Sequence, residues 1–361
     1  MKDRLQAKMR IAQIIATALS GLLLAFHAQA EPVTIGIAAP LSGPFERLGQ
    51  QIAAGAKLAA TGHDIQLAII DDQCSAAGGE HAARHFVEQK AQIAIGFLCT
   101  QAVEAASPLL MEAGIPVIMT GPRTESLTDQ KNRTGWPLFR LGPRDDDERN
   151  AIADMLTRRW KSDYFAIIDD GTIYGRELAG AFREKVRQAA LEPVFIDTFR
   201  PGLDNQIALA GRLKRAGATH AFVGGDAADI AIMARDAAKL DADMTFAGGE
   251  ALRSAAPDVP FAVGTLMIAP PEWADVAEPV AVQAFLQAGI QAEGYALPAY
   301  AAIQIALSAI KSDRPVIEVF SEKEFATSIG PVRFNAQGDL AQNLYRLYRF
   351  DGQDFVQIEA E

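Results

Sequence analysis

The sequence predicts an α/β protein of two similar lobes, each a mostly parallel β-sheet flanked by helices. Short apolar segments rich in β-branched residues alternate with segments whose apolar residues recur at helical spacing. Such alternation builds parallel sheets with helices on both faces. The alternation stops at a polar stretch, residues 129–133, and then restarts. The chain has 361 residues, which is long for one compact domain and suits two.

The first series of elements begins with an apolar strand over residues 33–39, which ends at the turn Ser42-Gly43-Pro44. The spacing of the next apolar residues predicts a helix over 47–60. The rest of the series is predicted as strands over 66–70, 92–96 and 116–118 with helices over 79–90 and 101–113.

The second series repeats this pattern, and the region after Pro270-Pro271 departs from it. The second series is predicted as helices over 146–160, 174–190, 205–216 and 226–239 with strands over 164–168, 193–196, 220–224, 244–247 and 264–268. After the two prolines we expect helices over 278–288, 295–311 and 315–327, then strands over 332–334, 344–350 and 355–358. Asp351-Gly352 is the turn between the last two strands.

Residues 1–30 have the parts of an export signal. Lys and Arg residues precede an apolar run over 11–26, and the segment ends in Ala28-Gln29-Ala30, the small-x-small pattern at which a signal peptidase cuts. The apolar run contains Gln13 and Ser20 and is short for a membrane span. We expect a cleaved signal peptide, with a retained anchor helix as the alternative.

Composition excludes several classes of protein. Hydrophobic residues make up 49% of the chain and charged residues 22%, which suffices for apolar cores and excludes wholesale disorder. The net charge of −11 argues against nucleic acid or anionic lipid as the main partner. No second long apolar stretch follows the export signal, so we do not expect a membrane-embedded protein.

Two cysteines, Cys74 and Cys99, are too few for a disulfide scaffold or a cysteine-rich metal site. In an oxidising compartment such a pair tends to form a bridge, and closing the roughly 25-residue loop between them would stabilise the fold by about 3 kcal/mol. A free nucleophilic thiol at Cys99 is the alternative, but no His stands beside either cysteine to activate it. We expect a structural disulfide.

Motifs for catalysis and cofactor binding are absent from the sequence. It has no Gly-x-Ser-x-Gly elbow, no phosphate loop, and no Gly-x-Gly-x-x-Gly fingerprint after the first strand. His81 and His85 stand four residues apart on one predicted helix, a spacing that suits zinc, but only Glu88 shares their face as a third ligand. A solvated helix surface is the simpler interpretation, and we expect no metal, no cofactor and no enzyme activity.

Polar residues gather instead where the predicted strands end. Ligands of open α/β sheets bind beyond the carboxyl ends of the strands. A cleft between two such lobes would offer hydroxyls, Arg123 and helix N-termini to an anion, and carboxylates to a cation. A zwitterion such as an amino acid needs both. Aspartate and serine also cap helices, and we expect this role for Asp72 and Asp170.

Several short segments carry a resemblance to a known family. In chain order they are Val33-Thr-Ile-Gly-Ile-Ala-Ala-Pro-Leu-Ser-Gly-Pro44, Asp71-Asp-Gln-Cys74, Ile95-Gly-Phe-Leu-Cys-Thr100, Ala113-Gly-Ile-Pro116, Tyr174-Gly175, Gly248-Gly-Glu250 and Ile329-Gly-Pro331 through Gly338-Asp-Leu340. With these segments, the export signal and the cysteine pair, the chain resembles the Leu/Ile/Val-binding protein family, the periplasmic amino-acid-binding components of ABC importers. The resemblance is colinear over essentially all of the mature chain.

The resemblance implies the type I periplasmic-binding-protein fold, a two-lobed clamshell that traps its ligand as the lobes close. It also implies a Cys74–Cys99 bridge, a periplasmic location and a monomer. It places three crossovers between the lobes, near Gly142, Pro270 and Pro331. The N-terminal lobe is then 31–143 plus 271–330, and the C-terminal lobe is 144–270 plus 331–361.

In the N-terminal lobe, the resemblance implies four ligand-binding residues. Thr100 follows the second cysteine and corresponds to the hydroxyl residue that holds the ligand carboxylate. The next carboxylate-binding segment of the family falls on Pro122 and Arg123. Leu48 corresponds to the residue that lines the side-chain pocket.

In the C-terminal lobe, Asp145 begins the lobe, Tyr174 corresponds to the cleft tyrosine, and Glu250 corresponds to the ammonium-binding glutamate. Two residues depart from the family pattern. Arg123 stands where a threonine is usual, and either grips the α-carboxylate or receives a side-chain carboxylate. Asp226 stands where an aromatic residue often closes the pocket, and either favours an added amine or hydroxyl on the ligand or neutralises Arg123. Both departures favour a polar amino acid or related zwitterion over Leu, Ile and Val.

These inferences predict a periplasmic solute-binding protein of an ABC amino-acid import system, which closes on a small-molecule ligand and delivers it to a membrane permease. A sensor of the same fold, which reports a small amide, urea or an aromatic acid to a membrane receptor, is the alternative. An enzyme is disfavoured because no nucleophile–base pair emerges from the sequence.

Overall fold

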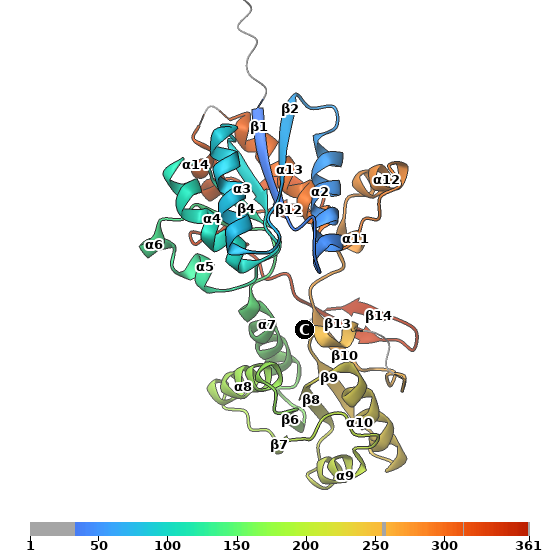
Figure 1. Ribbon diagram of the computed structural model, residues 1–361. Helices are drawn as coiled ribbons and strands as arrows, with labels where there is room; N and C mark the ends of the chain where they lie inside the picture. Colours follow the sequence, from blue (N-terminus) through green and yellow to red (C-terminus); the bar gives the residue numbers. More distant parts are fainter. Residues whose placement is uncertain (1–32, 255–257, 313, 360–361) are drawn as a thin grey trace, which may run out of the picture.

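The computed structural model describes residues 33–254, 258–312 and 314–359. Within these residues the chain forms two α/β lobes, one above the other, linked by extended segments (Figure 1). The predicted export signal at 1–30 lies outside the described residues. None of the helices described is both long enough and apolar enough to span a lipid bilayer.

The first lobe is a five-stranded parallel sheet with helices on both faces, in the strand order β2-β1-β3-β4-β5. Ile52 and Ile303 are buried on the face that α2 and α13 cover, and Phe86 and Val103 on the face that α3 and α4 cover. The strands are β1 (Val33–Ala39), β2 (Ile65–Asp71), β3 (Ile93–Gly96), β4 (Val117–Met119) and β5 (Leu138–Arg140). The four covering helices are α2 (Glu46–Ala60), α3 (Ala76–Glu88), α4 (Thr100–Glu112) and α13 (Ala296–Ile310).

The second lobe is a seven-stranded sheet in the order β14-β13-β10-β9-β8-β6-β7. Strand β13 is antiparallel to both neighbours, and the other pairs are parallel. Ile152 of α7 and Phe182 of α8 are buried on one face, and Leu213 of α9 and Ile230 of α10 on the other. The elements are α7 (Asp145–Arg159), β6 (Phe165–Asp169), α8 (Ile173–Gln188), β7 (Phe195–Thr198), α9 (Ile207–Arg215), β8 (His220–Gly224), α10 (Ala227–Lys239), β9 (Thr245–Gly248), the 3-10 helix η1 (Glu250–Arg253), β10 (Leu266–Ala269), β13 (Arg346–Phe350) and β14 (Phe355–Ile358).

The smaller elements belong to the first lobe. Strands β11 and β12 form an antiparallel pair of their own, and Phe285 of α12 packs with Leu297 of α13. The remaining elements are α5 (Ser126–Asp129), α6 (Lys131–Thr134), α11 (Trp273–Val276), α12 (Pro279–Gln287), α14 (Val316–Glu322), β11 (Phe325–Thr327) and β12 (Gly330–Val332).

Within the described residues, the chain passes between the lobes three times, after β5, after β10 and before β13. The sequence places the last crossover near Pro331, and the structure places it later. Phe334 is buried in the apolar core of the first lobe and forms a β-bridge with Leu340. Asp339 makes an ion pair with Arg140 of β5 at 2.8 Å. These contacts keep the chain in the first lobe through Leu340.

Most predicted strands and helices are confirmed to within a few residues, and the short elements α11 and η1 were not predicted. Three further regions differ. Strand β5 is missed because it is three residues long and ends in the charged Arg140, although all three residues are buried. The polar stretch after residue 125 forms the short helices α5 and α6. The helix predicted over 315–327 ends at Glu322, because Phe325 pairs with Val332 in the β11–β12 ladder.

Cys74 and Cys99 form a disulfide, as predicted, with their Cα atoms 5.2 Å apart. Cys99 is the residue before α4, and Cys74 lies in the turn after β2. The bridge therefore ties together two strand–helix connections of the first lobe.

The helix caps differ from the sequence prediction. Ser75 and Thr172 cap α3 and α8 through their side chains. Asp72 accepts a hydrogen bond from the amide of Cys74, and Asp170 accepts one from the amide of Thr172, both at 2.9 Å. These bonds to the second residue ahead are Asx turns, so the two aspartates shape the turn before each helix instead of capping it.

Candidate functional site

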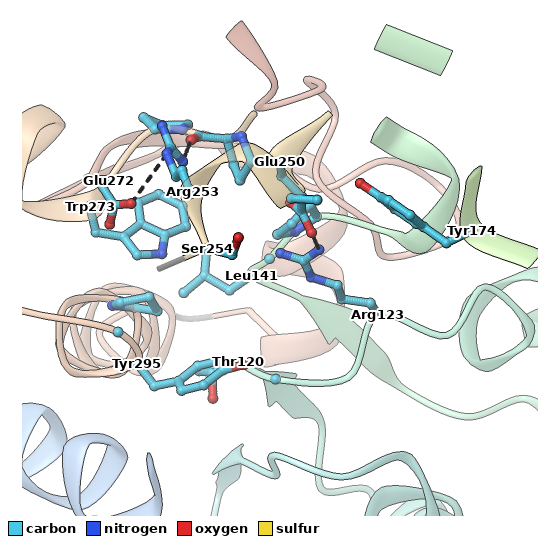
Figure 2. Close-up of a pocket in the computed structure, with 18 residues that line it drawn as sticks. Thr120, Arg123, Leu141, Tyr174, Glu250, Arg253, Ser254, Glu272, Trp273 and Tyr295 are labelled. Carbon is cyan, nitrogen blue, oxygen red and sulfur yellow. Dashed lines mark hydrogen bonds and ion pairs between the residues drawn. The ribbon is translucent and has the colours of Figure 1, made fainter. Parts of the chain in front are cut away.

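A cavity of about 560 Å³ lies between the lobes. Most of its walls are segments that directly follow β4, β5, β9 and β10, so it lies at the carboxyl ends of strands from both sheets. This is the edge at which open α/β sheets bind ligands. Figure 2 shows its lining residues, which are Thr120, Gly121, Arg123, Leu141, Gly142, Pro143, Tyr174, Glu250, Ala251, Arg253, Ser254, Pro270, Pro271, Glu272, Trp273, Gly294, Tyr295 and Pro298.

An ion pair joins the two lobes across this cavity. Arg123, in the segment after β4, donates from Nη1 to Oε1 of Glu250 at 2.7 Å (Figure 2). Glu250 is the first residue of η1, just beyond β9. The two side chains are 37% and 28% exposed, so water still reaches the pair. Burial lowers the pKa of the Arg123 guanidinium, but the charge of Glu250, its hydrogen bond to Arg123 and the nearby tyrosines together outweigh burial, so the pKa is raised.

Glu250 has fixed partners besides Arg123. Its Oε2 accepts a hydrogen bond from the Tyr345 hydroxyl at 2.8 Å, and its backbone N–H donates to Oε1 of Glu148 at 2.7 Å. Tyr345 is fully buried and directly precedes β13. The Glu250 carboxylate is therefore held in one orientation, with Arg123 on one oxygen and Tyr345 on the other.

Glu148, in the first turn of α7, is a buried acid behind Glu250. It is 4% exposed, and its Oε1 also accepts a hydrogen bond from the Tyr174 hydroxyl at 2.8 Å. Burial and the negative charge of Glu250 raise the pKa of Glu148 to about 7. Glu148 is not among the residues predicted from sequence, because acids are common in any first helical turn. Its helical spacing from Ile152 and Leu156, which are fully buried, is the signal that places it on the buried face.

Arg140, the last residue of β5, supports the opposite wall. It is 1% exposed and donates to the carbonyls of Pro122 at 2.7 Å and Thr124 at 2.9 Å. These carbonyls stand on either side of Arg123 in the chain. The Nε of Arg140 donates to Asp339 at 2.8 Å. A buried cation, balanced by a buried anion, thus fixes the segment that carries Arg123.

The other end of the cavity combines aromatic rings with a second charge pair. Figure 2 shows Trp273 and Tyr295 on this side, away from Tyr174. The Nε of Arg253 lies 3.4 Å from Oε1 of Glu272. The cavity therefore presents one cationic and one anionic side chain at each end. Among the described residues, no group of three or more His, Cys, Asp or Glu side chains could hold a metal ion.

A sequence profile of the periplasmic binding protein family matches residues 32–354. The chain belongs to this family.

Relatives and solved structures agree with this assignment. The chain is 28% identical over 347 residues to Leu/Ile/Val-binding protein homolog 3 of Brucella melitensis, across 91% of this chain and 94% of that protein. It also resembles the structure of an ABC transporter substrate-binding protein from Desulfitobacterium hafniense in complex with Leu, with 21% identity, 90% and 99% of the two chains covered and a TM-score of 0.63. A solute binding protein of an ABC transporter from Rhodopseudomonas palustris in complex with 3,4-dihydroxybenzoic acid shares 17% identity over 90% and 96% of the chains, with a TM-score of 0.60. These likenesses confirm the predicted two-lobed fold.

This periplasmic binding protein brings Arg123, Tyr174 and Glu250 together around the cavity. The other predicted ligand residues of the first lobe do not line it. The Thr100 hydroxyl is hydrogen-bonded to the Thr124 hydroxyl at 2.8 Å. Pro122 is buried and its carbonyl accepts from Arg140. Leu48 is half-buried on α2.

Two predicted residues of the second lobe also lie elsewhere. The Asp226 side chain caps α10 by accepting from the amide of Asp229 at 3.0 Å. Arg123 has Glu250, not Asp226, as its ion-pair partner. Asp145 lines a separate open depression of about 420 Å³ on the surface. Polar side chains at strand ends can thus be occupied by helix caps and local hydrogen bonds rather than by a ligand.

Proposed function

We propose that this chain is the periplasmic substrate-binding component of an ABC importer, and that it binds a polar amino acid or a related zwitterion. The observation that carries the proposal is the Arg123–Glu250 pair, in which a cation of one lobe meets an anion of the other at 2.7 Å. A zwitterion offers both lobes a replacement partner. Its carboxylate pairs with Arg123 and its ammonium with Glu250, through charge-assisted hydrogen bonds.

A ligand held in this way ties the lobes together. Its carboxylate contacts the first lobe and its ammonium contacts the second, so the full set of contacts forms at only one separation of the lobes. Only contacts that differ between two arrangements shift the equilibrium between them. The three chain crossings are the hinge about which the lobes close.

Relatives support both the transport role and the ligand class. The Brucella relative is named for Leu, Ile and Val, and the Desulfitobacterium structure contains Leu. Arg253 and Glu272 at the far end of the cavity offer partners to a polar side chain, which Leu cannot use. The export signal at 1–30 directs the protein to the periplasm, where it works as a monomer and delivers its ligand to the permease.

Aromatic acids are a second ligand class, favoured by the aromatic residues Tyr174, Trp273 and Tyr295 that line the cavity. The Rhodopseudomonas structure contains such an acid. An aromatic acid would use Arg123 for its carboxylate and leave Glu250 without a cationic partner. Leaving a partly buried charge unpaired opposes binding, so we rank this class below the amino acids.

A thermal-shift screen tests the ligand class. The protein is unfolded and refolded to remove carried-over ligand, then heated with the amino acids, γ-aminobutyrate, polyamines, urea, short amides and aromatic acids. A ligand at about 100 times its dissociation constant adds roughly 2.7 kcal/mol of stability. We expect polar amino acids to raise the midpoint of unfolding. A shift with aromatic acids alone would move the protein to the second class, and no shift with any compound would contradict both.

Uptake separates transport from sensing. Cells that lack this gene are given the radiolabelled compound that stabilises the protein. We expect uptake at low micromolar concentration to fall and to be restored by the wild-type gene. Unchanged uptake with a lost transcriptional response to the same compound would favour a sensor.

A further inference from the structure

One carboxylate oxygen joins two elements of the second-lobe wall. Oε1 of Glu148 accepts hydrogen bonds from the Tyr174 hydroxyl at 2.8 Å and from the Glu250 amide at 2.7 Å. These donors come from α8 and η1, whereas Glu148 comes from α7. A single buried acceptor therefore sets where Tyr174 and Glu250, both of which line the cavity, lie relative to each other.

Gly249 leaves the space that this arrangement needs. A Cβ atom at residue 249 would lie 2.1 Å from Oε1 of Glu148 and 2.8 Å from the Tyr174 hydroxyl. The backbone there has φ −88°, which any residue adopts. The glycine is thus needed for the close approach of the carboxylate to the backbone, not for its conformational freedom.

We propose that Glu148 is a positioning residue of the ligand site, which fixes Glu250 and Tyr174 relative to each other and places a second negative charge behind Glu250. Glu148 does not line the cavity, so it acts through the two residues that do. This role rests on the proposed ligand site at Glu250, although none of its contacts involves a ligand.

Groups from every neighbouring element act on Glu148. Burial and the like charge of Glu250 on η1 raise its pKa to about 7, against the hydrogen bonds from the Glu250 amide and Tyr174 and the positive charge of Arg123. Tyr345, beside β13, also interacts with Glu148 through its charge. On its own helix the nearest charged residues are Asp145, Asp146, Asp147 and Arg149.

Glu148 therefore exists in two forms near neutral pH, and these forms hold the wall differently. In the ionised form, Oε1 is a charged acceptor, and hydrogen bonds to charged acceptors are roughly twice as strong as neutral ones. In the neutral form the proton sits on Oε2, because Oε1 already accepts two hydrogen bonds. Glu148→Gln reproduces the neutral form, since an amide oxygen can accept the same two bonds without a charge.

The amide of Glu250 reports on this state directly. With selective ¹⁵N-glutamate labelling, the ¹H–¹⁵N signal of Glu250 is assigned by its loss in Glu250→Gln. We expect this signal to titrate in the wild-type protein with a midpoint near pH 7 and to stay fixed between pH 5.5 and 8.5 in Glu148→Gln. Asp154→Asn is the matched control, because Asp154 lies on the same helix and pairs with Lys185 at 2.6 Å. This variant should keep the titration.

Two results would overturn the proposal: no titration of the Glu250 amide near neutral pH in the wild-type protein, or an unchanged titration in Glu148→Gln. Glu148→Leu tests positioning separately, since leucine fills space without accepting a hydrogen bond. It should shift the Glu250 amide and the Tyr174 ring signals, which Glu148→Gln leaves near their low-pH wild-type positions. If Glu148→Leu fails to fold, the Gln arm still decides. Neither arm uses a ligand, so a failed ligand screen and a failed titration are distinguishable.

Discussion

The two walls of the cavity carry opposite charges and are supported in different ways. In the first lobe, Arg140 holds the carbonyls beside Arg123 and is balanced by Asp339 at 2.8 Å. In the second lobe, Glu148 holds Glu250 through its amide and has the same sign of charge as Glu250. One support is an ion pair, and the other brings two like charges together.

This difference determines which of the two cavity walls changes with pH. Arg140 supports the Arg123 segment through two backbone carbonyls, which have no titratable proton. Burial and the charge of Glu250 raise the pKa of Glu148 to about 7, so its charge changes in the neutral range. The first-lobe wall therefore offers a ligand a fixed set of contacts, whereas the contacts of the second-lobe wall change with pH.

Arg140→Met should have the largest effect, because it removes the side chain that holds the Arg123 segment in place. The substitution leaves the carbonyls of Pro122 and Thr124 without their donor and removes one of the partners of the buried Asp339. Losing one partner of a buried ion pair costs about 3–5 kcal/mol. We expect a fall of this size in the free energy of unfolding, measured by urea denaturation.

Arg144→Met is the control for this variant. Arg144 also pairs with Asp339, at 2.9 Å, but its side chain is partly exposed and it lies at the crossover. It should cost less than Arg140→Met. Arg144 also pairs with Asp129 and Asp146, so a loss from Arg144→Met as large as that from Arg140→Met would contradict a special role for the support of the Arg123 segment.

Glu250→Gln should come next, and it acts on binding. Glutamine retains an acceptor for Tyr345 and removes the charge that we propose pairs with a ligand ammonium. We expect amino-acid affinity to fall by on the order of 2–5 kcal/mol, measured by calorimetric titration with the compound found in the thermal screen. Affinity for an aromatic acid should be unchanged or higher. A loss of less than tenfold for the amino acid would remove Glu250 from the ammonium site.

The fold was predictable because its signals are local. Apolar alternation and helical spacing depend on neighbours in the chain, so strands such as β1 and β8 begin and end where the sequence predicts. Strand β5 and the last crossover were not predictable in this way. Both depend on the burial of Arg140 and Asp339 against each other, and these residues are 199 positions apart.

The candidate site shows the same distinction between local signals and contacts between residues far apart in the chain. Arg123 and Glu250 follow the ends of β4 and β9, where a ligand of an α/β sheet binds, and the family resemblance distinguishes them from other polar residues at strand ends. Glu148 contacts Glu250 from 102 residues away, and only the packing of α7 reveals it. Thr100 and Asp226 also stand at strand ends, but local hydrogen bonds engage their side chains.

The pH dependence of the free energy of unfolding tests the comparison between the two cavity walls. The pKa of Glu148 is about 7 in the folded protein, raised from an ordinary value of 4.5 by burial and the charge of Glu250. The folded state therefore binds the proton more tightly than the unfolded state. The stabilisation is complete below pH 4.5 and is lost as pH rises through 7. Glu148→Gln lacks this loss, so it should gain on the order of 2–3 kcal/mol over the wild-type protein between pH 5 and pH 8.

Urea denaturation of both proteins across this range measures the difference. The comparison isolates Glu148, because other buried acids such as Asp72 and Asp229, whose pKa values are also raised by burial, are present in both proteins. A constant difference between the two stability curves would show that Glu148 does not titrate in this range.

Gly249→Ala should have the smallest effect and tests the second wall alone. The new methyl group would meet Oε1 of Glu148 at 2.1 Å and the Tyr174 hydroxyl at 2.8 Å, so the side chains of both residues must move. Overpacking of this kind costs about 1–3 kcal/mol. We expect a lower melting midpoint and a downward shift of the Glu148 titration, because displacement of the carboxylate toward water relieves the burial that raises its pKa.

Gly180→Ala is the matched control, since Gly180 lies on the exposed face of α8 with no atom within 4 Å of a new Cβ. In a helix interior that change should be neutral or stabilise by about 0.5–1 kcal/mol. Equal effects from the two alanines would mean that the space at Gly249 does not serve Glu148.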